Sequence, residues 1–154
     1  MTASGKHPGG IAFLLAQLGA HAANRFAERT ADLGLAPSEV GLLRMIATQP
    51  GRSQRSLAEE LGVVASRVTA LVDPLERSGL VERRRSTNDR RNYELHLTDR
   101  GMQVLGRVRE VAMAHEAELC EGLDERQRDE LATLLRAVAE HQGLTPGVHP
   151  GYRA

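Results

Sequence analysis

The stretch that decides the fold runs from Gly51 to Gly101 and reads GRSQRSLAEELGVVASRVTALVDPLERSGLVERRRSTNDRRNYELHLTDRG. Two segments with helical apolar spacing meet at Leu61-Gly62-Val63, where the glycine favours a tight turn. Two alternating segments then flank a polar, arginine-rich tip at residues 86–92. This order predicts two short helices followed by a two-stranded hairpin, which is a winged helix-turn-helix module.

The second helix of this module is the one that can enter a DNA groove. Ser53 is predicted to cap the first helix, residues 54–61, and Gly62 to make the turn. In the second helix, Val68, Leu71, Val72 and Leu75 follow the helical period and should be buried. Its outward face is then formed by Ser66, Arg67, Thr69, Ala70 and Asp73. Strands are predicted at residues 80–85 and 93–98, with Leu95 and Leu97 directed inward.

Charge is distributed unevenly, although 20 basic and 20 acidic side chains give the whole chain no formal charge. Residues 83–91 hold five arginines and one acid, a difference of +4, whereas residues 102–142 hold five arginines and nine acids, a difference of −4. Neutralisation of phosphates with counterion release supplies much of the affinity of proteins for DNA. A basic wing beside a groove-sized helix therefore favours a surface for double-stranded DNA over a merely solvated charged strand.

Helices are also predicted on both sides of the module, so the fold class is mainly α. The winged helix-turn-helix lobe, with its two-stranded wing, should span residues 36–98. Residues 11–32 and 99–141 should form N- and C-terminal dimerisation helices, because their apolar stripes would otherwise be exposed patches. Residues 1–10 are expected to be disordered and residues 142–154 to form a flexible tail. The stripes consist of Leu14, Leu15, Leu18, Leu131, Leu134, Leu135 and Val138.

Composition and motifs argue against several classes of protein. The single Cys120 excludes an intramolecular disulfide and suits a cytoplasmic protein, and an inert packed thiol is preferred over a redox switch. No secretory signal is visible, and no segment approaches the roughly 18 consecutive apolar residues of a membrane span. The histidines are too scattered for a metal site. Without a phosphate-binding glycine loop, nucleophile elbow or catalytic pair, we expect no cofactor and no enzymatic activity.

The motifs of this stretch resemble those of the MarR family of bacterial transcription regulators. Leu75-Glu76-x-x-Gly79-Leu80-Val81 is followed by Asp89-x-Arg91 and then by Leu97-Thr98-x-x-Gly101. The likeness extends over about residues 11–141. It implies a triangular homodimer in which the helix around Ser66–Ala70 enters the major groove, Arg91 reaches the minor groove, and Asp89 holds Arg91 in place. The expected DNA-contacting set is Ser53, Gln54, Ser66, Arg67, Thr69, Ala70, Arg84, Arg85, Asp89, Arg90 and Arg91.

Three positions depart from the family pattern. Val64 and Ala36 stand where an oxygen-bearing N-cap is common, so the helix after Val64 should lose roughly 1 kcal/mol at its first turn or begin later, at Ser66. Pro74 lies inside this helix and removes the hydrogen bond to the carbonyl of Ala70. A tolerated kink is the preferred interpretation, and a tuned docking angle is the alternative.

Two classes of function remain. The first is a sequence-specific transcription regulator, a repressor that binds an inverted-repeat operator as a homodimer and is relieved by a small molecule between the dimer helices and the DNA-binding lobe. The second is a winged helix used as a protein-interaction module that does not read DNA. The arginines of the wing favour the first class, because a module that had abandoned DNA has no physical need for them.

Overall fold

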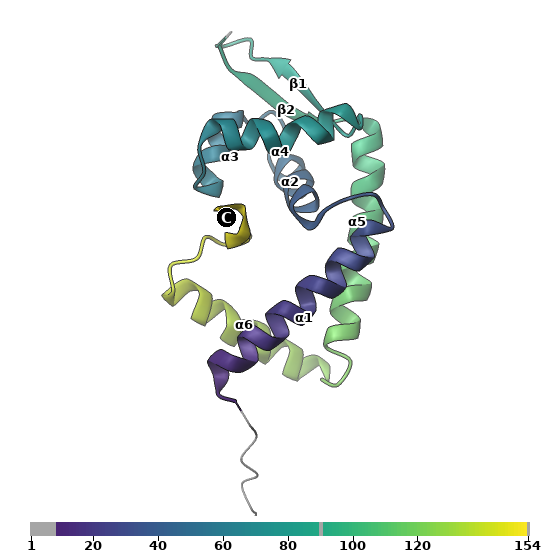
Figure 1. Ribbon diagram of the computed structural model, residues 1–154, viewed down its shortest axis with the longest axis vertical. Helices are drawn as coiled ribbons and strands as arrows, with labels where there is room; N and C mark the ends of the chain where they lie inside the picture. The colour runs from purple at the N-terminus through teal and green to yellow at the C-terminus, as the bar shows by residue number, and fades with distance from the viewer. Residues whose placement is uncertain (1–8, 90, 154) are drawn as a thin grey trace, which may run out of the picture.

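The computed structural model describes residues 9–89 and 91–153, and it is mainly helical (Figure 1). A two-stranded wing lies at one end, and helices from both termini lie at the other. The predicted order of helices and strands is confirmed. The elements are α1 (Ile11–Ala31), α2 (Pro37–Thr48), α3 (Gln54–Leu61), α4 (Ala65–Arg77), β1 (Val81–Arg85), β2 (Tyr93–Leu97), α5 (Asp99–Leu119), α6 (Glu125–His141) and a 3-10 turn (Pro150–Arg153).

Most of the core lies in the winged-helix lobe, residues 36–98, and Leu35, Leu105, Val108 and Tyr152 extend it. Its side chains are mostly aliphatic because the chain has no tryptophan and only 3% aromatic residues. Burial of such side chains is the main favourable term in folding. The predicted inward faces of α3 and α4 are confirmed, except that Leu71 is only partly buried. The fully buried apolar side chains are Leu42, Leu43, Ile46, Leu57, Leu61, Val68, Val72, Leu75, Val81 and Leu95.

The wing is attached to the lobe through β2. Strands β1 and β2 are antiparallel, with Arg83 of β1 opposite Leu95 of β2. Leu95 is fully buried in the core. The other edge of β2 pairs with the loop before α3. The N–H of Gly51 donates to the Leu95 carbonyl (2.9 Å), and the N–H of Leu95 donates to the Arg52 carbonyl (2.9 Å). Strand β2 is therefore held from both sides.

Helix α5 leaves the wing through a close backbone contact. Thr98 caps α5 as predicted, because its side chain accepts from the N–H of Gly101 (3.0 Å). A Cβ atom at Gly101 would lie 2.1 Å from the backbone oxygen of Leu80. Only glycine fits there, so Leu97-Thr98-x-x-Gly101 is a packing motif that fixes where α5 starts.

Helices α1 and α6 form the end opposite the wing, α5 runs from the wing to this end, and α6 crosses α1 in Figure 1. Helices α1 and α5 are joined by ion pairs, since the Glu118 carboxylate accepts from Arg25 Nη2 (2.9 Å) and from Arg29. Helix α6 is different because none of its residues is buried. The seven residues predicted to form the dimerisation stripes are between 40% and 65% exposed in this single chain.

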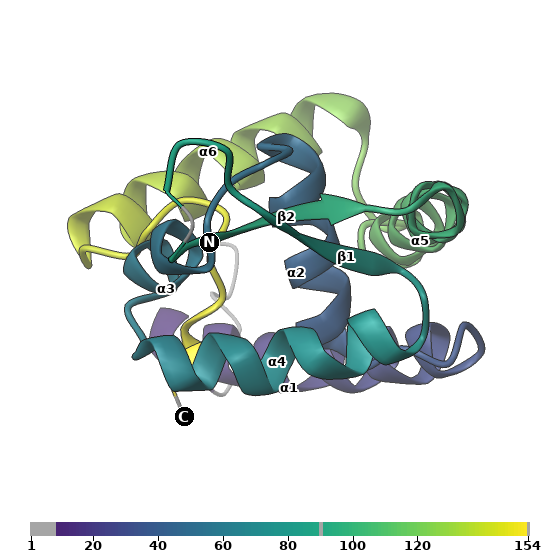
Figure 2. The same ribbon diagram turned by 90° about the horizontal axis from the view of Figure 1, so that it is seen from above.

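The C-terminal strap, residues 144–153, differs from the flexible tail that we expected. It turns back from α6 toward α2 and α3, as Figures 1 and 2 both show. Tyr152 is buried and Val148 is half-buried against the core. The expectation is wrong for these two residues because their apolar side chains find a place in the lobe. The disorder predicted for residues 1–10 falls almost wholly outside the described residues.

Candidate nucleic-acid interface

Helices α3 and α4 form the predicted helix-turn-helix. The Ser53 side chain accepts from the N–H of Ser56 (3.0 Å), which confirms the predicted cap of α3. Gly62 follows with φ 68°, a left-handed conformation that favours glycine. Helix α4 then begins at Ala65 without a side-chain cap from Val64. The helix therefore lacks the usual cap, but it does not start later, at Ser66.

The outward face of α4 is available for contact with a partner. Ser66, Arg67, Thr69 and Ala70 are exposed, as expected, while Val68 on the opposite face is fully buried. Figure 2 shows α4 running along one side of the wing. The helix continues through Pro74 to Arg77, and the Pro74 carbonyl accepts from the N–H of Ser78 (3.0 Å). The proline therefore does not end the helix, and the half that carries the expected DNA contacts precedes it.

Hydrogen bonds between residues close in sequence shape the wing tip. The Ser86 hydroxyl accepts from the backbone N–H groups of Asn88 (3.2 Å) and Asp89 (3.3 Å). The Asp89 carboxylate then accepts from the backbone N–H of Arg91 (3.0 Å) and from the Asn92 amide (3.1 Å). Asp89 is thus the organiser of a turn, as short polar side chains often are. Arg90, also predicted to contact DNA, lies outside the described residues.

The expected role of Asp89 needs a correction. We expected its carboxylate to hold the Arg91 guanidinium, whereas it holds the Arg91 backbone. No ion pair between these two side chains is recorded in the parts of the chain that the structure describes. The physical reason is the spacing: two residues along a tight turn, the nearest donor to the carboxylate is the main-chain N–H. Asp89 therefore sets the direction of the chain at Arg91.

Arg83 has a role that sequence analysis missed. Its side chain is only 15% exposed and joins α3, α4 and β1. Arg83 Nε donates to Gln54 Oε1 (2.7 Å), Nη2 to Asp73 Oδ1 (2.7 Å) and Nη1 to Glu76 Oε1 (3.2 Å). A planar guanidinium suits such multiple contacts. The sequence signal that could have indicated this role is the pair of acids on α4, one turn apart, facing the start of the wing.

The Arg83 network also occupies two residues that we expected to contact DNA. The Gln54 amide donates to the Thr69 hydroxyl (3.1 Å) while its oxygen accepts from Arg83. Both polar ends of Gln54 are therefore engaged in this chain. Thr69 remains exposed, so its hydroxyl can still be approached from outside. The structure thus places Gln54 between α3, α4 and the wing, where it supports the exposed face.

The arginines of the wing are not equivalent. Arg84 pairs with Glu82 on the same strand (Nε to Oε1, 2.6 Å), and Arg83 is enclosed by the two acids of α4. Arg85 and Arg91 are exposed, and no side-chain partner is recorded for either within residues 9–89 and 91–153. These two guanidinium groups can therefore approach phosphates without first breaking an ion pair.

A groove separates the exposed face of α4 from the wing tip. It has a volume of about 620 Å³ and includes Arg55 and Ala65 on the helix side and Arg91 and Tyr93 on the wing side. A helix face and a basic hairpin on either side of one groove match the way winged helices contact the two grooves of a duplex. The expected contacts Ser66, Arg67, Thr69, Ala70, Arg85 and Arg91 are all exposed in this region.

A second candidate site lies between the terminal helices and the lobe. One cavity of about 370 Å³ is bounded by Phe26, Val40, Arg44, Leu105 and Ala112. An adjoining cavity of about 340 Å³ shares Phe26 and Arg44 and is lined on another side by Tyr152. Burial raises the pKa of Tyr152 to about 12, with Arg44 opposing, so its phenol is protonated at neutral pH. Mostly apolar walls with Arg44, and with Arg109 in the first cavity, suit a small molecule that carries an acidic group.

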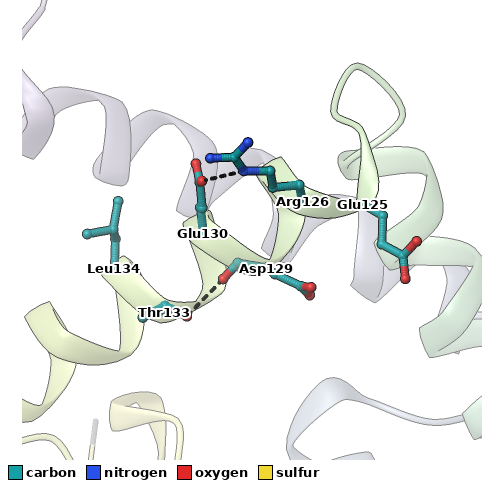
Figure 3. A pocket seen from close by; sticks show the side chains of 6 residues that line it. All are labelled: Glu125, Arg126, Asp129, Glu130, Thr133 and Leu134. Atoms are coloured by element: carbon teal, nitrogen blue, oxygen red, sulfur yellow. Dashed lines mark hydrogen bonds and ion pairs between the residues drawn. The ribbon is translucent and has the colours of Figure 1, made fainter.

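A further hollow of about 680 Å³ follows the first half of α6 (Figure 3). It is lined by one helix only, with Arg126 paired to Glu130 (Nε to Oε1, 3.2 Å) and Leu134 projecting beyond them. No cluster of three metal-binding side chains and no helix long and apolar enough to cross a membrane is found in the described ranges. Cys120 is a half-buried free thiol.

Comparisons with known proteins agree with this geometry. The sequence model of the MarR family matches residues 33–92. A protein of Thauera aromatica, described as a putative transcriptional regulatory protein for the hcr operon, is 35% identical over 117 residues, which are 76% of this chain and 70% of the relative. The match extends beyond the winged-helix lobe, so the similarity includes part of the terminal helices.

Two solved structures are similar to the whole architecture. The transcriptional repressor CouR, bound to a 23-mer DNA duplex, has 33% sequence identity and a TM-score of 0.76, with 84% of this chain and 92% of that chain covered. The Mycobacterium tuberculosis MarR family protein Rv2887, in complex with salicylic acid, has 28% identity and a TM-score of 0.67, with 84% and 96% covered. Both structures match the winged-helix fold of this chain.

Proposed function

Because the chain belongs to the MarR family of transcription regulators, we propose that it is a cytoplasmic repressor that binds an inverted-repeat operator as a homodimer. A small molecule that enters between the terminal helices and the lobe would relieve binding. The observation that carries the proposal is the exposed face of α4 beside a wing tip whose Arg91 has no recorded side-chain partner in the described residues. CouR, 33% identical, is a repressor solved on DNA.

The geometry supports two distinct contacts with the duplex. Ser66 and Arg67, on the exposed face of α4, would read base edges in the major groove. Arg91, at the hairpin tip, would enter a narrow A·T-rich minor groove, where the negative potential is enhanced. Asp89 would contribute by holding the backbone of Arg91 in the tip turn.

The homodimer is proposed from the terminal helices. Helix α6 has no buried residue, and Leu134 is 65% exposed. A stripe of leucines along a helix that its own chain does not cover requires a partner, and a second copy can bury both stripes around a two-fold axis. Two lobes related in this way would meet half-sites about one helical turn, roughly 34 Å, apart.

The effector is proposed from the crevice described above. Its two cavities share Phe26 and Arg44 and lie between the dimer helices and the lobe. The relative Rv2887, 28% identical, is solved with salicylic acid, an aromatic acid. A guanidinium against an apolar wall would bind a carboxylate and a ring of this kind. We therefore propose a small aromatic acid as the class of effector.

Titration of variants against operator DNA tests the proposal. Arg91→Ala should weaken binding, lower the salt dependence by about one phosphate equivalent and remove preference at the operator flanks. Arg67→Ala should cost roughly 1 to 3 kcal/mol and relax preference within each half-site. Asp89→Ala should act as a milder Arg91→Ala. The charge-matched control is Arg126→Ala on exposed α6, far from the wing, which should bind as the parent does.

The measurement is made at two salt concentrations with operators altered separately at flank and half-site. If Arg91→Ala binds every operator as the parent does, the minor-groove contact is wrong. If the parent itself shows no preference for any sequence in a random-duplex selection, the proposal fails, and the winged helix is a protein-interaction module.

A further inference from the structure

The C-terminal strap, residues 144–153, makes contacts that connect two parts of the molecule. It begins next to the end of α6 and ends in a 3-10 turn, Pro150–Arg153, against α2 and α3. Tyr152 is 7% exposed, and its hydroxyl donates to the Ser38 carbonyl at 2.6 Å. Arg44 of α2 donates to the Gly147 carbonyl at 2.5 Å. A dimerisation helix that touches little of its own chain is thereby tied to the lobe.

Helix α2 contains a residue that makes room for Tyr152. Gly41 lies inside α2, where glycine is among the poorest helix formers. A Cβ atom at this position would lie 2.0 Å from the Tyr152 hydroxyl oxygen and 3.2 Å from its ring carbon Cζ. Alanine at this position would therefore force the docked ring of Tyr152 to shift. The docked strap explains why a poor helix former occupies this position, because the atoms nearest to a Cβ atom at Gly41 would belong to Tyr152.

The contacts do not extend along the whole strap. Residues 144–147 and 149–151 are exposed, and Arg153 reaches the Leu61 carbonyl only at 3.5 Å. Docking therefore depends mainly on the Tyr152 ring and its hydroxyl, the half-buried Val148 and the bond from Arg44. A segment held by so few contacts can be released without unfolding the lobe, because local openings cost far less than global unfolding.

We propose that the strap is an internal latch that fixes the winged-helix lobe against the dimerisation helices and so sets the affinity for DNA. The inference rests on the proposed function as a dimeric DNA-binding protein. With Tyr152 docked on Gly41, each lobe is held at one distance from the two-fold axis and needs little ordering when it meets its half-site. With the latch released, the lobes must be ordered by DNA itself, which weakens binding.

Gly41→Ala is the sharpest perturbation, and the chain offers a matched control. Gly106 is also a glycine inside a helix, but a Cβ there would meet nothing within 4 Å. Gly106→Ala therefore improves helix propensity without touching the strap. A second latch variant ends the chain at Pro146 and leaves α2 unchanged, so that an effect of Gly41→Ala on folding can be separated from release of the strap.

Docking is measured first, on the full homodimer. The chain has no tryptophan and two tyrosines, so in a Tyr93→Phe background the fluorescence comes from Tyr152 alone. Acrylamide should quench this emission weakly in the background protein and in Gly106→Ala, and several times more strongly in Gly41→Ala. Equal quenching in the background protein and in Gly41→Ala would overturn the proposal, because Tyr152 would then not occupy the site on Gly41.

DNA affinity is measured next, with Tyr93 restored. Gly41→Ala and the chain ending at Pro146 should both bind the selected operator at least about fivefold more weakly than the parent and Gly106→Ala. Circular dichroism and sedimentation establish that the variants are folded dimers. If both latch variants bind the operator as tightly as the parent does, the latch proposal is wrong, although the proposed function still stands. A parent that prefers no DNA sequence would overturn the proposed function, whatever the quenching shows.

Discussion

Replacement of Arg83 by methionine should destabilise the lobe and weaken DNA binding for an indirect reason. Methionine keeps an apolar stem of similar length but removes the contacts to Gln54, Asp73 and Glu76. The carboxylates of Asp73 and Glu76 are 48% and 44% exposed, so water can solvate them after the change. The loss of folding free energy should therefore be smaller than for a buried charge left without a partner.

The magnitude follows from the separate contacts. Each ion pair with a half-exposed acid contributes up to about 1 kcal/mol. The hydrogen bond to the Gln54 amide contributes about 1 kcal/mol more. We expect Arg83→Met to lower the free energy of unfolding by about 2 kcal/mol, measured by urea denaturation at fixed dimer concentration. Binding should fall because α4 and the wing are no longer held together.

The matched control is Arg85→Met on the same strand. Arg85 is exposed and has no recorded side-chain partner among the described residues, so its replacement should change stability by less than about 0.5 kcal/mol. It should instead lower DNA affinity and the salt dependence of binding. The reasoning is refuted if Arg83→Met unfolds at the same urea concentration as the parent yet loses as much salt dependence as Arg85→Met. Arg83 would then contact DNA directly.

Three further changes test other parts of the structure. Pro74→Ala should raise the free energy of unfolding by up to about 3 kcal/mol in thermal or urea denaturation, because it restores a helical hydrogen bond to Ala70, and a decrease would show that the proline is required. Leu134→Glu should yield monomers in sedimentation if α6 is the interface, whereas an unchanged dimer would exclude this stripe. The pKa of His115 is lowered mainly by its burial and further by the nearby charges of Arg29, Arg25 and His21. Stability should therefore fall as the pH drops below about 6.5, since the unfolded chain binds the proton first. His115→Gln should flatten this part of a denaturation profile, and an unchanged slope would contradict the assignment.

Sequence patterns predicted the elements well because the lobe follows local rules. The cap at Ser53, the turn at Gly62 and the buried period of α4 depend on neighbours within a few residues, which the sequence displays directly. The flanking helices followed from their own apolar periodicity, and the resemblance to the family agreed with their order. The outward residues of α4 follow from the same period, since a helix that buries Val68 and Val72 must expose Ser66, Thr69 and Ala70.

The parts that sequence analysis did not predict depend on contacts between distant segments. Arg83 was counted as one of several wing cations, and only the approach of α4 and α3 to β1 shows that it is enclosed. We expected Asp89 to bind the Arg91 guanidinium, because the sequence does not show that the tip turn brings the backbone N–H of Arg91 closer to its carboxylate. Tyr152 was placed in a tail, since nothing near residue 152 indicates that Gly41, more than 100 positions earlier, provides its site.

The pairing of β2 on both edges has a consequence for the spacing of operator elements. Because the loop before α3 is bonded to the same strand that leads to the wing tip, α3 and the wing form one rigid body. In the proposed complex, the wing could not slide along the duplex while α4 stays in the major groove. One base pair inserted between half-site and flank would shift the flank by roughly 3.4 Å and rotate it by about a tenth of a turn. On each side of the operator, the protein would then keep either the contact of α4 or that of the wing tip, but not both. Operators should therefore keep a constant spacing between half-site and flank even where their sequences vary.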